Sequence, residues 1–148
     1  MILLDTNACV ALLKKRAPEL AERLAALPMA ETAICAIVRA ELMFGAAKSD
    51  KPAHAKAQTE LLLSGLTLLN FDAKCADEYG QIRFALERIG QGIGANDTLI
   101  AATARAHGAI LVTRNRREFD RVPGLVVESW RAGGHLLDAN LAPPQTKE

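Results

Sequence analysis

The chain opens with Met1-Ile2-Leu3-Leu4-Asp5-Thr6-Asn7, a run of apolar residues that leads directly into three polar ones. The continuous apolar run at residues 2–4 is typical of a strand that is buried on both faces of a parallel sheet. Asp5 then follows the carboxyl end of that strand, where ligands bind in open α/β sheets. Two interpretations stay open for this turn. Asp5 anchors a metal site, or the Asp-Thr-Asn sequence only caps the next helix.

Strand-like and helix-like segments alternate along the rest of the chain, and no internal repeat interrupts them. Alternation of this kind predicts an α/β domain in which a parallel sheet carries helices on both faces. We expect further strands at residues 32–35, 66–69, 109–113 and 125–127. We expect helices at residues 8–15, with Asn7 as the cap, and at 18–27, 36–47, 55–63, 73–89 and 95–107, with a polar break around Pro52.

The composition is that of an ordinary globular domain, since half of the 148 residues are hydrophobic and 24% are charged. Eighteen Lys and Arg against 17 Asp and Glu leave a net charge of +1, so no global positive field points to nucleic acid. The three cysteines are scattered in apolar stretches and indicate core residues in a reducing compartment. Without a signal peptide or an apolar run of about 20 residues, we expect a cytoplasmic protein with no membrane association.

Glu41 is a polar exception within the helix expected at residues 36–47. Its neighbours on the helix surface, three and four residues away, are Ile37, Val38, Phe44 and Gly45, which are all apolar or small. A carboxylate in an apolar stripe must be paired, protonated or bound to a metal. Binding of a metal and pairing with a distant Lys or Arg are equally compatible with this pattern.

Asp97 is a second exception, in the first turn of the helix expected at residues 95–107. The positive end of the helix dipole favours its ionised form there. Taken alone, Asp97 is explained equally well as an acid that complements this dipole.

A basic cluster follows the clearest strand of the chain, residues 109–113. Four arginines fall within residues 114–121. The planar guanidinium group suits phosphate because it donates two hydrogen bonds at once. The candidates for phosphate binding are Arg114, Arg116 and Arg117. The alternative is a solvated loop whose charges are partly neutralised by Glu118 and Asp120.

Four polar side chains are expected at one edge of the sheet, namely Asp5, Glu41, Asp97 and Asn115. Several carboxylates in one crevice repel one another unless a cation is present. A site that offers only oxygen ligands favours a hard ion such as Mg²⁺ or Mn²⁺. Such an ion can assist the hydrolysis of a phosphodiester, so we expect this reaction class.

The same residues carry a resemblance to a known family. Leu-Leu-Asp-Thr-Asn at residues 3–7, Arg-Ala-Glu-Leu-Met-Phe-Gly-Ala at 39–46, Ile-Gly-Ala-Asn-Asp-Thr-Leu-Ile-Ala-Ala at 93–102, and the segment 111–125 occur in the family's order. Together they resemble the PIN-domain ribonucleases and, more narrowly, the VapC toxins of bacterial toxin–antitoxin pairs. The resemblance covers residues 1–130 and leaves 131–148 as a flexible or partner-binding tail.

The resemblance implies a three-layer α/β/α PIN-like domain with a short central parallel sheet and Mg²⁺- or Mn²⁺-dependent endoribonuclease activity. It implies that Asp5 and Asp97 bind the metal, that Glu41 completes the acidic site, and that a fourth, more variable polar group is Asn115 or Glu118. Thr6, Asn7 and Thr113 would support these acids by hydrogen bonds, and Arg114, Arg116 and Arg117 would bind RNA.

The resemblance also implies partners. The family forms homodimers, and a cognate antitoxin inserts a segment into the acidic cleft. The segment Glu-Leu-Met-Phe-Gly-Ala-Ala-Lys-Ser at residues 41–49 looks like that of VapC toxins that cut tRNA, so tRNA is the favoured RNA.

Two departures from the family pattern concern detail around the acids. Ala36 and Val38 stand where relatives often carry Ser or Thr, which removes a helix cap worth about 1 kcal/mol. Asn115 is neutral where some relatives carry Asp.

Two rival functions stay open. The first is a phosphatase or phosphotransfer domain with Asp5 as nucleophile, although no second Asp follows two residues later. The second is a non-catalytic PIN-like domain that binds RNA or protein.

Overall fold

A parallel sheet forms the centre of the computed structural model, which describes residues 1–130. Within this range, the five strands pair in the order β3-β2-β1-β4-β5, and every pairing is parallel. The strands are β1 (Ile2–Leu4), β2 (Thr32–Cys35), β3 (Thr67–Leu69), β4 (Ile110–Val112) and β5 (Val127–Glu128). The C-terminal segment expected as a tail, residues 131–148, lies outside the described residues.

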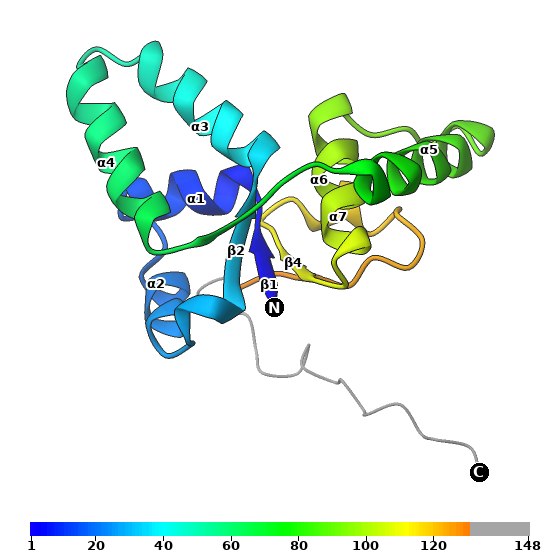
Figure 1. Ribbon diagram of the computed structural model, residues 1–148, viewed down its shortest axis with the longest axis horizontal. Helices are drawn as coiled ribbons and strands as arrows, with labels where there is room; N and C mark the ends of the chain where they lie inside the picture. Colours follow the sequence, from blue (N-terminus) through cyan, green and yellow to red (C-terminus); the bar gives the residue numbers. More distant parts are fainter. Residues whose placement is uncertain (131–148) are drawn as a thin grey trace.

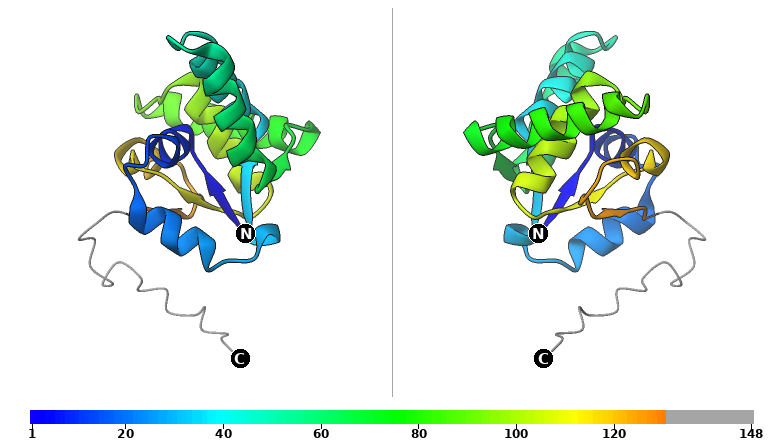
Figure 2. Two further views of the ribbon diagram at one scale, coloured as in Figure 1. Left: turned by 90° about the vertical axis from the view of Figure 1, so that its left-hand side faces the viewer. Right: turned by 90° about the vertical axis from the view of Figure 1, so that its right-hand side faces the viewer.

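Helices lie on both faces of this sheet, as predicted (Figures 1 and 2). Helices α1 (Thr6–Leu13), α2 (Pro18–Ala25), α3 (Ala36–Ala47) and α4 (Pro52–Ser64) lie to one side, with α3 packed on α4. Helices α5 (Ala73–Arg88), α6 (Ala95–Ala106) and α7 (Arg116–Phe119) lie to the other, with α5 packed on α6. The α3–α4 and α5–α6 pairs therefore form two arms on opposite sides of the sheet.

β1 occupies the middle of the sheet and is buried on both faces. Leu3 and Leu4 are inaccessible to solvent, as is Leu111 on the neighbouring strand β4. Full burial of each such side chain stabilises the fold by about 1.5–3 kcal/mol. β1 pairs with β4 in a register that places Leu4 opposite Val112. The residues that follow these two strands are therefore held side by side.

The cap of the first helix differs from the prediction. Asp5, and not Asn7, is the N-cap residue of α1, and its carboxylate accepts a hydrogen bond from the Ala8 amide. Asn7 lies inside the first turn with an exposed side chain. Both residue types are favoured caps, and the strand end decides between them because β1 stops at Leu4. The helix therefore begins two residues earlier than expected.

Two further segments also correct the prediction. The polar break is present but shorter than expected, at residues 48–51, and Pro52 begins α4, where a proline at the first helical position costs no hydrogen bond. The short helix α7 replaces part of the loop expected after β4, and Met29–Glu31 forms an additional 3₁₀ turn.

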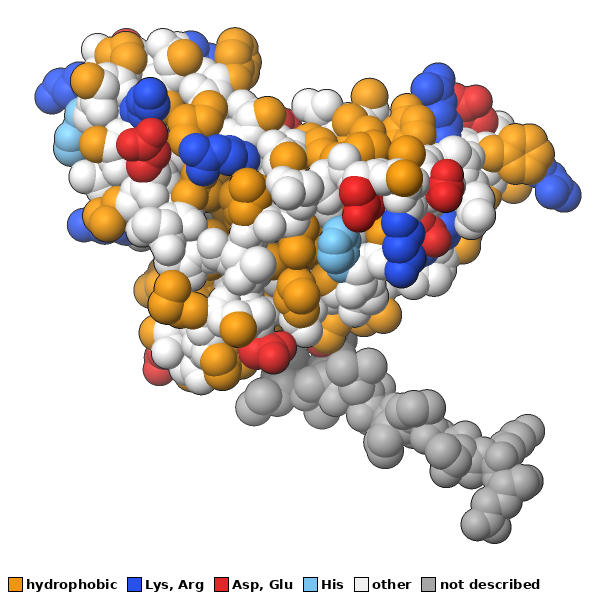
Figure 3. Space-filling view, in the orientation of Figure 1, with side chains coloured by type: hydrophobic (Ala, Val, Ile, Leu, Met, Phe, Trp, Pro, Cys, Tyr) orange, Lys and Arg blue, Asp and Glu red, His pale blue; other side chains and the backbone are white. Residues whose placement is uncertain are grey.

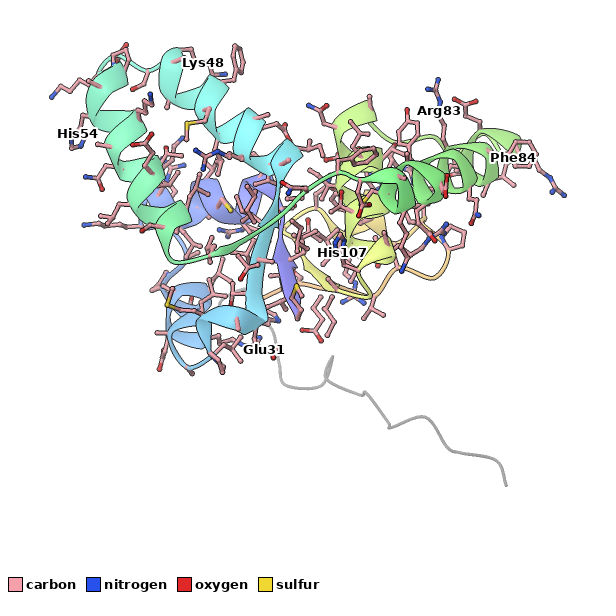
Figure 4. All side chains as sticks on the ribbon, viewed as in Figure 1. Glu31, Lys48, His54, Arg83, Phe84 and His107 are labelled. Atoms are coloured by element: carbon pink, nitrogen blue, oxygen red, sulfur yellow. The ribbon has the colours of Figure 1, made fainter. Side chains whose placement is uncertain are left out.

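The cysteines agree with the expectation from composition. Cys9, Cys35 and Cys75 are free thiols buried in the interior. In Figure 4, His54 on α4 and His107 at the end of α6 lie on different arms. Among residues 1–130, no helix is long and apolar enough to cross a membrane.

Candidate acidic active site

Asp5 is held on two sides at the carboxyl edge of the sheet. One carboxylate oxygen, Oδ1, accepts a hydrogen bond of 2.8 Å from the backbone N–H of Ala8. The other, Oδ2, accepts a hydrogen bond from the hydroxyl of Thr113, which follows β4. The side-by-side register of β1 and β4 creates this second contact. Because Asp5 is only 3% exposed, its carboxylate has one fixed orientation.

The environment of Asp5 contains opposing electrostatic effects. Burial raises the pKa of this carboxyl, and the charge of Glu41 raises it further. The hydrogen bonds from Thr113 and Ala8 favour the ionised form and lower the pKa, as does the positive charge of Arg114. Burial is the largest of these effects, so the net shift is upward.

Thr113 connects Asp5 to the segment that follows β4. Its hydroxyl donates to Asp5 and accepts a 2.8 Å hydrogen bond from the backbone N–H of Asn115. Asn115 is the N-cap residue of α7, but its side chain makes no capping hydrogen bond. The structure thus places the backbone of Asn115 next to the site without giving its amide a partner among the acids.

Glu41 reaches the same edge from α3. Its Oε1 atom accepts a 2.7 Å hydrogen bond from the hydroxyl of Thr6, the first residue of α1. The predicted apolar surroundings exist only on one side, since Val38 is fully buried whereas Phe44 is 67% exposed. The half-buried carboxylate is therefore oriented by a neutral hydroxyl group.

Asp97 completes the arrangement from the first turn of α6. Burial raises the pKa of this half-buried carboxyl to about 6, and a hydrogen bond shared with Glu118 contributes to the rise. The negative charges of Glu118, Glu41 and Asp5 act in the same direction. Acids from three other elements are therefore close enough to disfavour the ionisation of Asp97.

The donor set fits a hard divalent cation by chemistry and by charge. It offers only carboxylate and hydroxyl oxygens, and the mutual repulsion of its carboxylates is what a cation relieves. In the part of the chain described by the structure, however, no three acidic, histidine or cysteine side chains are grouped closely enough to hold one ion as they stand. Glu41 is turned to Thr6 and Asp97 to Glu118, so shared ligation requires their side chains to rotate.

The arginines after β4 have different environments. Arg114 is half-buried, and its charge favours the ionised form of Asp5. Arg116 forms an ion pair of 3.1 Å with Asp120 one turn further along. Arg117 is exposed to solvent. An acid of the same segment therefore neutralises the charge of Arg116, as in the alternative of a solvated loop.

Two features of the site escaped the sequence prediction. One is the Ala8 amide, a backbone group that no side-chain pattern reveals. The other is the direct pairing of Glu118 with Asp97, because the short helix α7 that presents Glu118 was expected to be a loop. The only signal in the sequence for this pairing is the position of Glu118, about one helical turn after Asn115.

A family model of the PIN domain matches residues 2–125. This range contains the acidic edge and every helix and strand described above except β5. The chain therefore belongs to the PIN-domain family.

Similar proteins narrow this class to its VapC group. Ribonuclease VapC2 of Rickettsia felis is 43% identical over 129 residues, which are 86% of this chain and 96% of that protein. The tRNA(fMet)-specific endonuclease VapC of Shigella flexneri is 40% identical over 128 residues, again 86% and 96% of the two chains. The crystal structure of VapBC2 from Rickettsia felis bound to a promoter DNA fragment has a TM-score of 0.83 at 42% identity, covering 88% of this chain and 99% of that chain.

Proposed function

We propose that the chain is a Mg²⁺- or Mn²⁺-dependent endoribonuclease that hydrolyses RNA at the acidic edge. The observation that carries this proposal is the convergence of Asp5, Glu41 and Asp97 from separate elements on one edge of the sheet, where their charges and burial raise the pKa of Asp97 to about 6. Crowding of this kind destabilises the folded protein unless a cation joins the site. The relatives named as ribonucleases support the same reaction class.

In the proposed metal site, Asp5, Glu41 and Asp97 would hold the ion, with Glu118 as the fourth acid. When bound, the ion would supply Lewis-acid stabilisation of the negative charge that develops on a phosphodiester. We assign the fourth position to Glu118 and not to Asn115, since Glu118 shares a hydrogen bond with Asp97.

The chain's own residues would orient the reacting groups and move a proton. Thr113 and the Ala8 amide fix the Asp5 carboxylate, and Thr6 fixes Glu41. Glu118, which lies beside Asp97, would accept a proton from the attacking water. Arg114, Arg116 and Arg117 would hold the RNA backbone beside these acids.

We propose tRNA as the substrate, because two relatives are named as tRNA(fMet)-specific endonucleases. Cleavage of tRNA would inhibit translation, which is the action expected of a toxin.

We further propose that a cognate antitoxin neutralises the enzyme and that the enzyme forms a homodimer. The similar structures include VapBC complexes, among them VapBC-1 from Haemophilus influenzae with a TM-score of 0.81. A groove of about 650 Å³ between α3 and α4 offers an apolar surface for the antitoxin. Its lining includes Met43 and Ala46. Arg39, Lys56 and Glu60 add charged side chains of both signs to its lining.

The rival function as an aspartate-nucleophile phosphatase is disfavoured by the residues around Asp5. Asn7 stands where a second Asp would follow two residues later, and Arg114 and Asn115, not a Lys, follow β4.

Incubation of purified protein with a total tRNA pool tests the proposal. We expect cleavage with Mn²⁺ or Mg²⁺, none with EDTA, and a loss of at least about 10²-fold in Asp97→Asn. Asp72→Asn is the matched control, because Asp72 is an exposed N-cap residue of α5 and Asn caps equally well. Full activity of Asp97→Asn, or metal-independent activity of the wild type, would contradict the metal site, and a folded protein without any cleavage would favour the non-catalytic alternative.

A further inference from the structure

A small pocket lies between α5 and the start of α6, on a different side of α6 from the acidic edge. Its volume is about 140 Å³, and its lining includes Tyr79, Arg83 and Glu87 from α5 and Ala95 and Thr98 from α6. Pockets that enclose drug-sized ligands have volumes of about 300–1,000 Å³, so this pocket is much smaller. The pocket therefore suits a single planar ring and not a whole nucleotide.

The polar rim of this pocket is a row of hydrogen-bonded side chains on α5. Arg83 donates one hydrogen bond of 3.1 Å to the hydroxyl of Tyr79 and another of 2.8 Å to Glu87. These three residues lie on successive turns of α5, so they form a continuous row. The row presents an aromatic ring together with a hydrogen-bond donor and an acceptor, which are the groups that recognise an unstacked base.

The apolar floor and the opposite rim are also ordered. Leu86 is 2% exposed and belongs to the core, and Ile93 packs against the same core. The backbone of Gly92 borders the pocket. Its carbonyl accepts a 3.3 Å hydrogen bond from Arg121, which lies in the segment after α7. A pocket with this much internal support loses little entropy when a ring enters it.

The pocket lies next to the acids along the first turns of α6. Ala95 and Thr98 line it, whereas Asp97, between them in sequence, faces Glu118 and the other acids. The Asp97 carboxylate lies next to Gly94, so the pocket and the acids are neighbours at the start of α6. An RNA strand whose phosphodiester lies at the acids can place a nearby base in the pocket.

We infer that this pocket binds an unstacked nucleobase of the RNA substrate, by stacking on Tyr79 and by hydrogen bonds to Arg83 and Glu87. The inference rests on the proposed ribonuclease function and adds a base-binding subsite to it. Base recognition next to the acids would select single-stranded or loop segments, because a paired base cannot leave its stack without cost.

Binding of a fluorescently labelled single-stranded RNA of about ten nucleotides, measured by anisotropy in EDTA, tests the subsite. We expect Tyr79→Leu to weaken binding about tenfold, since each base that stacks on an aromatic ring contributes roughly this much. Tyr79→Phe keeps the ring and should stay within about twofold of the wild type. Phe84→Leu is the matched control, because Phe84 is an aromatic residue on the same helix, is 67% exposed, and points away from Arg83 (Figure 4).

The salt dependence of binding separates stacking from a general loss of structure. Stacking releases no counterions, so the slope of log K against log salt should be the same for Tyr79→Leu and the wild type. Equal affinity of Tyr79→Leu and the wild type, in a preparation whose wild type cleaves RNA with Mn²⁺, would overturn the subsite and leave the proposed function intact. A wild type that neither binds nor cleaves RNA would overturn both.

Discussion

The acidic edge consists of two halves that are built in opposite ways. In the strand half, Asp5 lies between Thr113 and the Ala8 amide, and both of its carboxylate oxygens accept hydrogen bonds. In the helix half, Asp97 faces Glu118 and the other acids, and their charges oppose its ionisation. Figure 3 shows the outline hollowed between the two arms, α3–α4 and α5–α6, that carry the helix half.

This difference separates two roles of a carboxylate at the proposed site. Asp5 contributes to folding, as the cap of α1, and to the proposed metal site. Asp97 opposes folding at neutral pH, because it must ionise in a partly buried position beside other acids. Burial raises the pKa of both acids, but only Asp5 also caps a helix and accepts hydrogen bonds with both carboxylate oxygens. Removal of the side-chain carboxylate should therefore destabilise the strand half and stabilise the helix half, while it abolishes the proposed activity in both.

The largest expected effect concerns activity in both halves. Asp5→Asn and Asp97→Asn should each reduce RNA cleavage by about 10²–10³-fold or more, because each removes a charge that would hold the cation. Single-turnover cleavage of tRNA with Mn²⁺ measures this loss. A variant of either residue with more than about a tenth of wild-type activity would separate that half from catalysis.

The next effect concerns the stability of the strand half. Asp5→Ala should lower the free energy of unfolding by about 2–4 kcal/mol, since it removes the cap of α1 and leaves the buried Thr113 hydroxyl and Ala8 amide without a partner. Urea denaturation monitored by circular dichroism measures the change. Asp5→Asn preserves the capping oxygen and should cost about 1 kcal/mol or less. Equal losses in the two variants would show that the cap is not the reason.

The third effect is a gain in stability on substitution of Asp97, and its size depends on pH. The pKa of Asp97 is about 6 in the folded protein, above the ordinary 3.8, so the folded state binds more protons between these values. Its contribution to stability therefore falls as pH rises from about 4 to 6. Asp97→Asn should stabilise the protein at pH 7.5 by on the order of 1 kcal/mol after allowance for solvent screening, and the gain should vanish below about pH 4.

Thermal unfolding of the wild type and Asp97→Asn over pH 4–8 checks this window. A stability difference that does not change with pH would show that the crowding of the acids does not destabilise the fold.

The smallest expected effect concerns the arginines beside the two halves. Arg117 is exposed, so Arg117→Ala should leave stability unchanged, weaken RNA binding a few-fold and reduce the salt slope by about 0.7. Arg16, an exposed arginine after α1, provides the control variant Arg16→Ala. Identical affinities and slopes for both variants would exclude Arg117 from the RNA-binding surface.

The strand half was the more predictable half from the sequence. A continuous apolar run that ends in Asp5 indicates both the buried strand and the position of the acid, because strand ends are defined by composition. The sequence did not show that Asp5 itself is the cap, since Asp, Thr and Asn are all favoured caps. The register of β1 and β4, which brings Thr113 to Asp5, is a property of the folded sheet.

The helix half was predicted in its residues but not in its pairings. The positions of Glu41 and Asp97 follow from helix periodicity and from the start of α6. Their partners depend on how the helices dock, which local patterns do not contain. Glu118 shows this most clearly, because the four-residue helix α7 that presents it has too few residues for a periodic signal.

Calorimetric titration of Mn²⁺ into the metal-free protein tests the central claim most directly, namely that crowded carboxylates at this edge bind a divalent cation. We predict that binding at pH 6 releases protons, seen as a dependence of the heat on the buffer, because Asp97 is about half protonated there. The proton release should be absent at pH 8, and Asp97→Asn should bind Mn²⁺ much more weakly at both values. Absence of binding to the folded wild type, or equal affinity in Asp97→Asn, would contradict the account.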